Sequence, residues 1–376
     1  MSVRPHHSRE DIRRLSRGRL PRLLYGYIEG GGFDEGTVRR NREDLDNLLV
    51  RQRVMVDAGT PDMSTTLLGQ RLAMPLVLAP VGIAGMMARR GEAQAARACA
   101  EAGVPLCIST FSLCPVEEVA RAGGVAPWFQ LYPLCDLGLR QALVDRALAA
   151  ECEVLVVTVD VPTPSVRYRE TRRPLEAPPG FGPWIERAFD GLTHPRWFYD
   201  VYLRGGPHLP GNLPPGAPRA MAIATPEVLA EIRKAWPGRM VVKGILDPED
   251  ARTAVAIGAN AIVVSNHGGR QLDGVRSSIA ALGPVVDAVA GRAQVLVDGG
   301  FASGLDLFKA LVVGADGCLI GRAWVHALAA GGEAGVRTLL ARIARELAMA
   351  MLLAGRGTIG AIDRTVLDEA VSPFVP

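Results

Sequence analysis

From residue 74 onward, short apolar runs alternate with longer segments that have helical periodicity. The runs have strand length and lie at 74–80, 105–110, 127–132, 154–160, 240–245, 261–267, 294–300 and 317–322. The segments between them are rich in alanine and include 92–102, 137–150, 248–257 and 304–313. Strands that are apolar throughout and alternate with helices are typical of a parallel sheet that is covered on both faces.

Eight such units predict an α/β protein with a (β/α)8 (TIM) barrel. A doubly wound open sheet usually has fewer strands and a dinucleotide fingerprint after the first one. Here the first run continues as Val81-Gly82-Ile83-Ala84-Gly85, which lacks that fingerprint. We therefore predict a single domain over 1–376, with N-terminal helices in 1–73 that plug or cap the barrel. The barrel itself spans 74–330, and 331–376 forms a C-terminal helix, at about 333–353, and a tail.

The connection after the fourth strand is much longer than the others. About eighty residues separate Asp160 from Met240, and an insert at about 171–225 is rich in proline and glycine. The aromatic residues of this stretch are Phe181, Trp184, Phe189, Trp197, Phe198, Tyr199 and Tyr202. In a barrel such a loop emerges on the C-terminal face, beside the active site, and loops of this length are usually functional or disordered.

Composition restricts the class of protein further. The 376 residues are 48% hydrophobic and 22% charged, which fits a globular protein, and a net charge of +3 provides no strong field for nucleic acid. The six cysteines form no C-x-x-C pair and have no histidine at metal-ligand spacing, so we expect reduced thiols and no metal site. There is no apolar signal segment and no uncharged run long enough to cross a membrane, so the predicted location is cytoplasmic.

Polar side chains stand at the carboxyl ends of most predicted strands, where a barrel builds its active site. They are Gln130 and Tyr132, Thr158 and Asp160, Lys243, Ser265 and His267, Asp298, and Arg322. One such residue would be an ordinary strand end or turn. Because so many converge on one face, we predict an active site there.

Lys243 is unusual because the chain has only three lysines and otherwise uses arginine. A lysine inside an apolar strand suggests a need for a compact ammonium group. One interpretation is a Schiff base with substrate, and the other is charge compensation beside an electron-rich ring.

An imidazole and a guanidinium lie three residues apart in the stretch 265–271, where Gly268 and Gly269 separate His267 from Arg270. Histidine can accept a proton near neutral pH, and arginine offers a planar fork to a carboxylate. Asp160, two strands earlier, is suited to orient the imidazole as in a base-and-orienter pair. Further candidates for holding an acidic substrate are Arg167, Tyr27 and Tyr132.

Glycine turns follow the last two strands. Asp298-Gly299-Gly300 and Gly321-Arg322 occupy the units in which these barrels commonly bind phosphate through backbone N–H groups. The position of the glycines, more than their presence, indicates a phosphate site.

Together these residues resemble the FMN-dependent 2-hydroxy-acid oxidases and dehydrogenases, a family that includes glycolate oxidase, mandelate dehydrogenase and quinone-linked L-lactate dehydrogenase. The stretch 265–271 is similar to that family's active-site motif. Segments 160–164 with 167–169, 243–250, and 321–323 with 327–329 resemble the bacterial L-lactate dehydrogenase branch in particular.

The resemblance implies FMN as cofactor and oxidation of an L-2-hydroxy acid, L-lactate first, with electrons passed to quinone or oxygen. It makes His267 the catalytic base, with Asp160 and Tyr132 beside it, and Tyr27, Tyr132, Arg167 and Arg270 the substrate-binding residues. It assigns flavin contacts to Pro80, Val81, Gly82, Ser109, Gln130, Thr158, Lys243, Ser265, Asp298, Gly299, Gly300, Gly321 and Arg322. Lys243 would lie near N1 of the ring, which favours charge compensation. The family also implies a homo-oligomer, a tetramer.

Three features depart from the family pattern. Ala302 stands where relatives commonly have an arginine on the phosphate, so one charged contact is missing. Gly82 stands where glycolate oxidases carry alanine beside the flavin, which leaves more room above the ring. The insert at 171–225 is shorter than expected for the lactate branch.

Alternatives remain at this point. An FMN-dependent isomerase would explain the glycines but not the grouping of His267, Arg270 and Arg167. An inactive flavin-binding module would not need His267 and Asp160. The aromatic insert, with Arg172, Arg173, Arg187, Arg196 and Arg204, is either a peripheral contact with the inner face of the cell membrane or a lid over the site.

Overall fold

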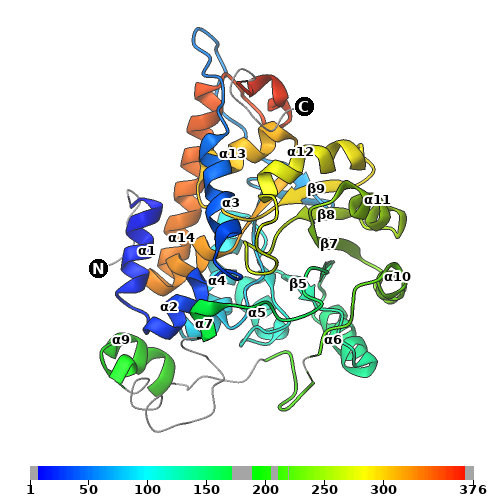
Figure 1. Ribbon diagram of the computed structural model, residues 1–376. Helices are drawn as coiled ribbons and strands as arrows, with labels where there is room; N and C mark the ends of the chain where they lie inside the picture. Colours follow the sequence, from blue (N-terminus) through cyan, green and yellow to red (C-terminus); the bar gives the residue numbers. More distant parts are fainter. Residues whose placement is uncertain (1–6, 172–188, 205–210, 219, 369–376) are drawn as a thin grey trace.

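The computed structural model describes residues 7–171, 189–204, 211–218 and 220–368 (Figure 1). Within these residues, eight parallel strands form one sheet in the order β3-β10-β9-β8-β7-β6-β5-β4. A parallel bridge between Leu78 and Leu106 closes the ring. The predicted (β/α)8 barrel is therefore confirmed. The strands are β3 (Leu76–Leu78), β4 (Cys107–Ile108), β5 (Trp128–Leu131), β6 (Val154–Thr158), β7 (Arg239–Ile245), β8 (Ala261–Val264), β9 (Gln294–Val297) and β10 (Gly317–Ile320).

A helix follows each strand and packs outside the ring (Figure 1). These helices are α4 (Gly91–Ala102), α5 (Val116–Gly123), α6 (Leu137–Ala149), α10 (Pro226–Ala235), α11 (Pro248–Ala256), α12 (Ser278–Val289), α13 (Gly304–Val313) and α14 (Arg322–Leu353). Several begin at a side chain that accepts a hydrogen bond from the first turn: Asp136, Thr225, Asp247, Ser277 and Ser303. Such caps satisfy backbone donors that a helix leaves unpaired, which fixes where each helix starts.

The last helix is interrupted at Gly332, whose φ of 61° and ψ of −146° are not helical. The part before this residue is the eighth barrel helix, and the part after it is the long C-terminal helix that the sequence predicts. Helix α14 packs against α1, α4 and α13, and α1 lies beside it in Figure 1.

Helices α1 (Arg9–Arg17), α2 (Arg22–Glu29) and α3 (Gly36–Asn47) precede the barrel, as expected. The plug, however, is a hairpin and not a helix. Strands β1 (Thr65–Leu67) and β2 (Gln70–Leu72) pair through a turn at Leu68 and Gly69, which both have positive φ, as a two-residue hairpin turn requires. Leu67, Leu68 and Leu72 are buried in one cluster with side chains of the barrel strands, so they fill its amino-terminal end.

Alternate strand residues fill the barrel interior. Val77, Val156, Val241 and Val263 belong to the interior cluster, while their neighbours pack outward against the helices. Since the interior is packed with side chains, a ligand site must lie at an end of the barrel.

The insert after β6 contains α7 (Tyr168–Thr171), α9 (Pro195–Trp197) and the π-helix η2 (Phe198–Leu203). The indole Nε1 of Trp197 donates a hydrogen bond to the carbonyl of Met86, 2.7 Å away, and so joins this part of the insert to the barrel. Phe181, Trp184, Arg172, Arg173 and Arg187, which contribute to the lid and membrane interpretations, lie outside the described residues. Short 3-10 helices are η1 (Ala84–Met86), η3 (Ile359–Ala361) and η4 (Arg364–Val366).

None of the described helices combines the length and the apolar character needed to span a bilayer.

Candidate active site

A cavity of about 1110 Å³ opens at the carboxyl ends of the barrel strands. This volume is at the upper end for ligand pockets, which usually measure about 300–1,000 Å³. Most of the site residues predicted from the sequence line this cavity: Tyr27, Pro80, Val81, Gly82, Ser109, Tyr132, Arg167, Lys243, His267, Arg270, Asp298, Gly299, Gly300, Gly321 and Arg322. Residues from the first and the last strand, and from α2, therefore share one space.

Gln130, Thr158, Asp160 and Ser265 are not among the lining residues and stand directly behind them. The Ser265 hydroxyl lies 2.9 Å from Lys243 Nζ and accepts a hydrogen bond from the backbone N–H of His267. Gln130 accepts a hydrogen bond from the Ser109 hydroxyl, and Thr158 pairs in register with Lys243. These residues position the side chains that line the cavity.

His267 and Asp160 form the expected pair. Nδ1 of His267 lies 3.0 Å from Oδ1 of Asp160, and both side chains are largely buried. Burial opposes ionisation of Asp160, but His267 and Lys243 outweigh it and keep its pKa below the usual value. An ionised carboxylate on Nδ1 fixes the proton on that nitrogen, so Nε2 is the ring nitrogen left to accept a proton.

The backbone at the base is strained. His267 has a φ of 56°, and Gly268 and Gly269 follow with 64° and 75°. A left-handed conformation is unfavourable for a residue with a side chain and is often found at functional sites. Asn266 compensates locally, because its side-chain oxygen accepts a hydrogen bond from the N–H of Gly269. The strained turn directs His267 toward the cavity and not along the next helix.

Asp160 also depends on close packing with β7. Gly244 has a φ of 113°, and a Cβ atom at this position would lie 2.7 Å from Cβ of Asp160. The register between β7 and β8 shifts at this glycine. Because only glycine fits this approach, Gly244 is part of what holds the orienting carboxylate in place.

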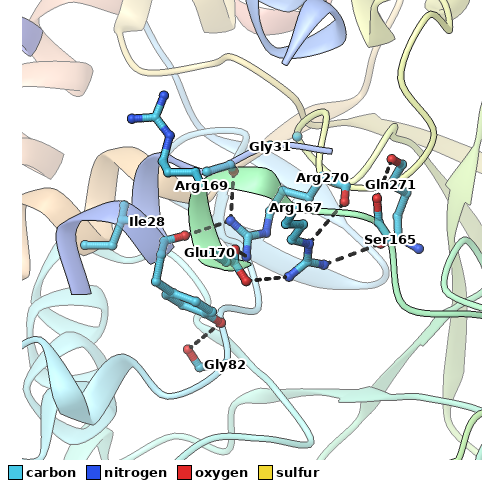
Figure 2. A network of polar contacts seen from close by, with 12 residues as sticks. Ile28, Gly31, Gly82, Ser165, Arg167, Arg169, Glu170, Arg270 and Gln271 are labelled. Carbon is cyan, nitrogen blue, oxygen red and sulfur yellow. Dashed lines mark hydrogen bonds and ion pairs between the residues drawn. The ribbon is translucent and has the colours of Figure 1, made fainter. Parts of the chain in front are cut away.

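Glu170, which the sequence analysis did not single out, pairs with both Arg167 and Arg270 (Figure 2). Oε1 of Glu170 is 2.7 Å from NH2 of Arg270, and Oε2 is 3.3 Å from NH1 of Arg167. Arg270 also donates to the carbonyls of Tyr27 and Gly30. One carboxylate therefore spans the two guanidinium groups. The only feature of the sequence that could have indicated Glu170 was its position, three residues after Arg167.

Both tyrosines are kept protonated by their surroundings. Burial, followed by the charge of Asp160, raises the pKa of Tyr132, and burial raises that of Tyr27. The Tyr27 hydroxyl donates to the carbonyl of Gly82. The Arg270 guanidinium lies over the Tyr27 ring, with its Cζ atom 4.9 Å from the centroid of the ring. Both hydroxyls therefore keep their protons at neutral pH, and that of Tyr27 is donated to Gly82 in this structure.

Lys243 is buried and paired. Its Nζ lies 2.9 Å from Oδ2 of Asp298. Burial disfavours the charged amine, but Asp298 and Asp160 together raise its pKa above the usual value. A lysine that forms a Schiff base must be neutral to attack a carbonyl. The charged state of Lys243 therefore favours charge compensation over the Schiff base.

The residues present fit an FMN molecule. Among the described residues, the buried Nε2 of Gln130 and Oδ1 of Asp298 have no hydrogen-bond partner, so an unused acceptor lines the cavity and an unused donor stands directly behind its wall. At the other end Arg322 is partly buried and donates to the carbonyls of Ile28, Gly30 and Gly268. Burial, with the nearby Arg270, lowers the pKa of Arg322 to about 10. A partly buried guanidinium that lines the cavity suits an anionic phosphate.

A pair of asparagines completes the site without a clear sequence signal. Nδ2 of Asn41 donates to Asn266 at 2.9 Å, and Nδ2 of Asn266 donates back at 2.7 Å. This reciprocal pair joins α3 to the turn that carries His267. Asn266 stands inside the motif, but nothing in the sequence around Asn41 predicts this contact.

Comparison with known proteins agrees with this geometry. The model of the family described as FMN-dependent dehydrogenase matches residues 16–369. An L-lactate dehydrogenase of Xanthomonas campestris pv. campestris is 48% identical over 382 residues, covering 96% of this chain and 98% of the relative. An L-lactate dehydrogenase of Caulobacter vibrioides is also 48% identical, with 97% and 98% covered.

Solved structures give the same result. The monotopic membrane protein (S)-mandelate dehydrogenase superposes with a TM-score of 0.90 at 33% identity and covers 96% of this chain and 98% of its own. Mandelate oxidase with benzoyl-formic acid has a TM-score of 0.83 at 39% identity, with 94% and 96% covered. With a family model across nearly its whole length and relatives close to half identical, the chain belongs to the FMN-dependent dehydrogenase family and is an FMN-dependent oxidoreductase.

Proposed function

We propose that this enzyme oxidises an L-2-hydroxy acid to the 2-oxo acid, with L-lactate as the first candidate substrate. The single observation that carries the proposal is the cavity shared by His267, Arg167 and Arg270. A hydroxy acid needs a base beside its C2 atom and a cation beside its carboxylate, and these three side chains supply both. The L-lactate dehydrogenases that are 48% identical to this chain favour lactate among such acids.

In this proposal Arg167 and Arg270 bind the carboxylate through charge-assisted hydrogen bonds. Tyr27 and Tyr132 donate to the carboxylate and the hydroxyl. His267 removes one proton from the substrate, and Asp160 stabilises the imidazolium that results. FMN, when bound, supplies the acceptor for the two electrons. Transfer of the C2 hydrogen as hydride and abstraction of it as a proton both require a base at this position.

Spectroscopy of the holoenzyme without oxygen tests the reaction. We expect L-lactate to bleach the flavin absorbance, D-lactate and a simple alcohol to leave it unchanged, and a panel of L-2-hydroxy acids to rank the side chains that the site accepts. His267→Gln should bind flavin and fold but react about 10²- to 10⁴-fold more slowly, the usual contribution of a general base. Full activity in that variant would refute the assignment.

The same experiment separates the alternatives. An FMN-dependent isomerase would convert its substrate without lasting bleaching, and an inactive flavin-binding module would not be bleached by any acid of the panel. Bleaching by L-2-hydroxy acids excludes both.

We propose that the electron acceptor is quinone, with oxygen as the alternative. We also propose that the enzyme binds peripherally to the inner face of the cell membrane. The solved relative (S)-mandelate dehydrogenase is a monotopic membrane protein. In the insert, Phe189, Leu192, Tyr199, Tyr202 and Leu203 are exposed. Aromatic residues favour the bilayer interface, and Arg196 and Arg204 in the same segment suit anionic lipid.

Liposomes test this part directly. Holoenzyme should float with vesicles that contain anionic lipid, and Tyr199→Ser/Leu203→Ser should weaken this flotation without changing flavin bleaching. If wild-type protein ignores the vesicles, the insert is a lid and the membrane proposal fails. The acceptor is identified by comparing the rates at which a soluble quinone analogue and oxygen reoxidise the reduced flavin. The homotetramer implied by the family stays a prediction, which light scattering of the holoenzyme tests.

A further inference from the structure

The active-site cavity extends past the glycine turns to the C-terminal helix. Its wall continues from Gly300 and Arg322 to Ala302 and Arg342, the latter on the second part of α14. The resemblance described above leads us to expect an arginine on the phosphate at position 302, where this chain has alanine. The structure thus brings a different arginine, from a part of the chain forty residues later, to the position beside that alanine.

Arg342 is almost fully buried, with 5% of its surface exposed. NH2 donates to the carbonyl of Ala302 at 2.8 Å, and NH1 donates to the carbonyl of His7 at 3.1 Å. Nε is buried and has no hydrogen-bond partner among the described residues. Arginine has five N–H groups, so the two carbonyls leave most of its donors unused.

The positive charge of Arg342 is paired with one carboxylate, that of Glu346. Backbone carbonyls do not neutralise a cation, and the nearest carboxylate oxygen, Oε1 of Glu346, is 3.5 Å from Nε. The other oxygen of Glu346 accepts from the N–H of Gly304. Asp306 is engaged by Arg42 and by the N–H of Ala302. A buried cation is costly unless anions pair with it, and a phosphate at this end of the cavity would add a second anion to the pair with Glu346.

We propose that Arg342 takes over the role of the arginine missing at position 302 and binds the phosphate of FMN, together with Arg322. The C-terminal helix then contributes directly to cofactor binding. This inference depends on FMN as the cofactor and not on the identity of the hydroxy acid, so it can fail while the proposed reaction stands.

The test measures how strongly the enzyme prefers FMN over riboflavin, which lacks the phosphate. Holoenzyme is incubated with increasing riboflavin, and the bound flavins are separated and quantified. In Arg342→Leu we expect the preference for FMN to fall about 10- to 100-fold, the range of a hydrogen bond to a charged group. Affinity for riboflavin itself should change less than about threefold.

Two further variants make the result specific. Ala302→Arg in the Arg342→Leu background should restore the preference for FMN, because it returns an arginine to the same end of the cavity. Arg345→Leu removes the same charge from an exposed position on the same helix and should leave the preference unchanged. If Arg342→Leu does not fold, Arg342→Gln decides, since its amide can still donate to Ala302 but carries no charge.

The alternative is that Arg342 serves only to join the chain near His7 and Ala302 to α14. In that case Arg342→Leu and Arg342→Gln would lower the melting temperature and the affinity for both flavins equally. An unchanged ratio of FMN to riboflavin affinity, or no restoration by Ala302→Arg, would overturn the proposal.

Discussion

Nδ1 of His267 lies 3.0 Å from Oδ1 of Asp160, although 107 residues separate them in the sequence. The two residues follow β8 and β6, and β7 lies between these strands. The second carboxylate oxygen of Asp160 is buried and has no hydrogen-bond partner among the described residues. The negative charge is therefore directed at the imidazole, where it stabilises a protonated ring.

Replacement of Asp160 by asparagine keeps the size of the side chain and removes this charge. We expect kcat to fall by about 10²-fold, within the range that a general base contributes, while flavin stays bound. Asp287→Asn, which removes an exposed carboxylate from α12, is the matched control and should keep full activity. A similar kcat in Asp160→Asn and wild type would show that the charge of Asp160 does not support the base.

Glu170 balances part of the charge of the substrate-binding arginines. Burial, with the nearby Arg270, lowers the pKa of Arg167, which reflects the cost of holding these two cations together. In Glu170→Gln the carboxylate no longer competes with a bound acid. We expect the unreactive acid oxalate to bind about 3- to 10-fold more tightly, corresponding to about 1 kcal/mol, and kcat to decrease because Arg270 is less firmly held.

The measurement is inhibition by oxalate at several ionic strengths, with Glu170→Asp as the variant that keeps the charge. Weaker oxalate binding in Glu170→Gln would contradict the expectation. It would mean that Glu170 acts only by holding the arginines in position.

Gly244→Ala tests the packing of β7 against Asp160. The added methyl group would lie 2.7 Å from the Asp160 side chain, and the φ of 113° is unfavourable for alanine. We expect a loss of about 1–3 kcal/mol in the free energy of unfolding and a fall in kcat of about 10- to 100-fold, because the orienting carboxylate is displaced.

Gly291→Ala is the control, since that residue also has a positive φ, 72°, but no heavy atom within 4 Å of an added Cβ. It should lose stability and keep turnover. If urea unfolding and kinetics give the two variants the same profile, the contact with Asp160 does not matter for catalysis.

Much of the architecture follows from the sequence because parallel strands buried on both faces leave a clear signal. Helix α13 matches its predicted range, and α4, α6 and α11 differ from theirs by one residue at one end. The hairpin plug was not predicted, because strands as short as β1 and β2 carry too few residues for a clear alternation. Their partner is the barrel interior, which sequence alone does not locate.

Site residues at the ends of strands were predictable from the sequence. Site residues that reach the cavity from helices were much less predictable. His267, Asp160 and Lys243 follow from their positions in the barrel pattern. Glu170, Asn41 and Arg342 act through tertiary contacts from helices, and polar residues on helices are usually solvated. From Ala302 the sequence predicted only a missing charged contact, and nothing in the sequence indicated the proposed contribution of Arg342.

A partly buried acidic residue, Glu29, makes stability depend on pH. Glu29 accepts two hydrogen bonds from Arg13 and lies 2.8 Å from Nε2 of His326. Burial opposes its ionisation, but His326 and Arg13 lower its pKa to about 2. Since the pKa in the unfolded chain is about 4.3, the stabilisation is fully present above about pH 5 and is lost as pH falls toward 2.

Glu29→Gln should therefore be less stable than wild type at pH 7, by up to about 3 kcal/mol. The difference should shrink steadily between about pH 5 and pH 3. Urea unfolding of both proteins at several pH values measures this difference in stability. The contributions of the other carboxylates are common to both proteins and cancel in the comparison. A difference that does not depend on pH would exclude a contribution from ionised Glu29.

The segment around Gly30 closes the active site through partners that are synthesised much later. Its carbonyl accepts hydrogen bonds from Arg270, 240 residues further on, and from Arg322, 292 residues further on. Contacts across such sequence separation form late in folding, because loop closure must precede them. During synthesis, these hydrogen bonds of Gly30 can therefore form only after β8 and β10 have been made. This side of the flavin pocket is therefore complete only after Arg322 has been synthesised.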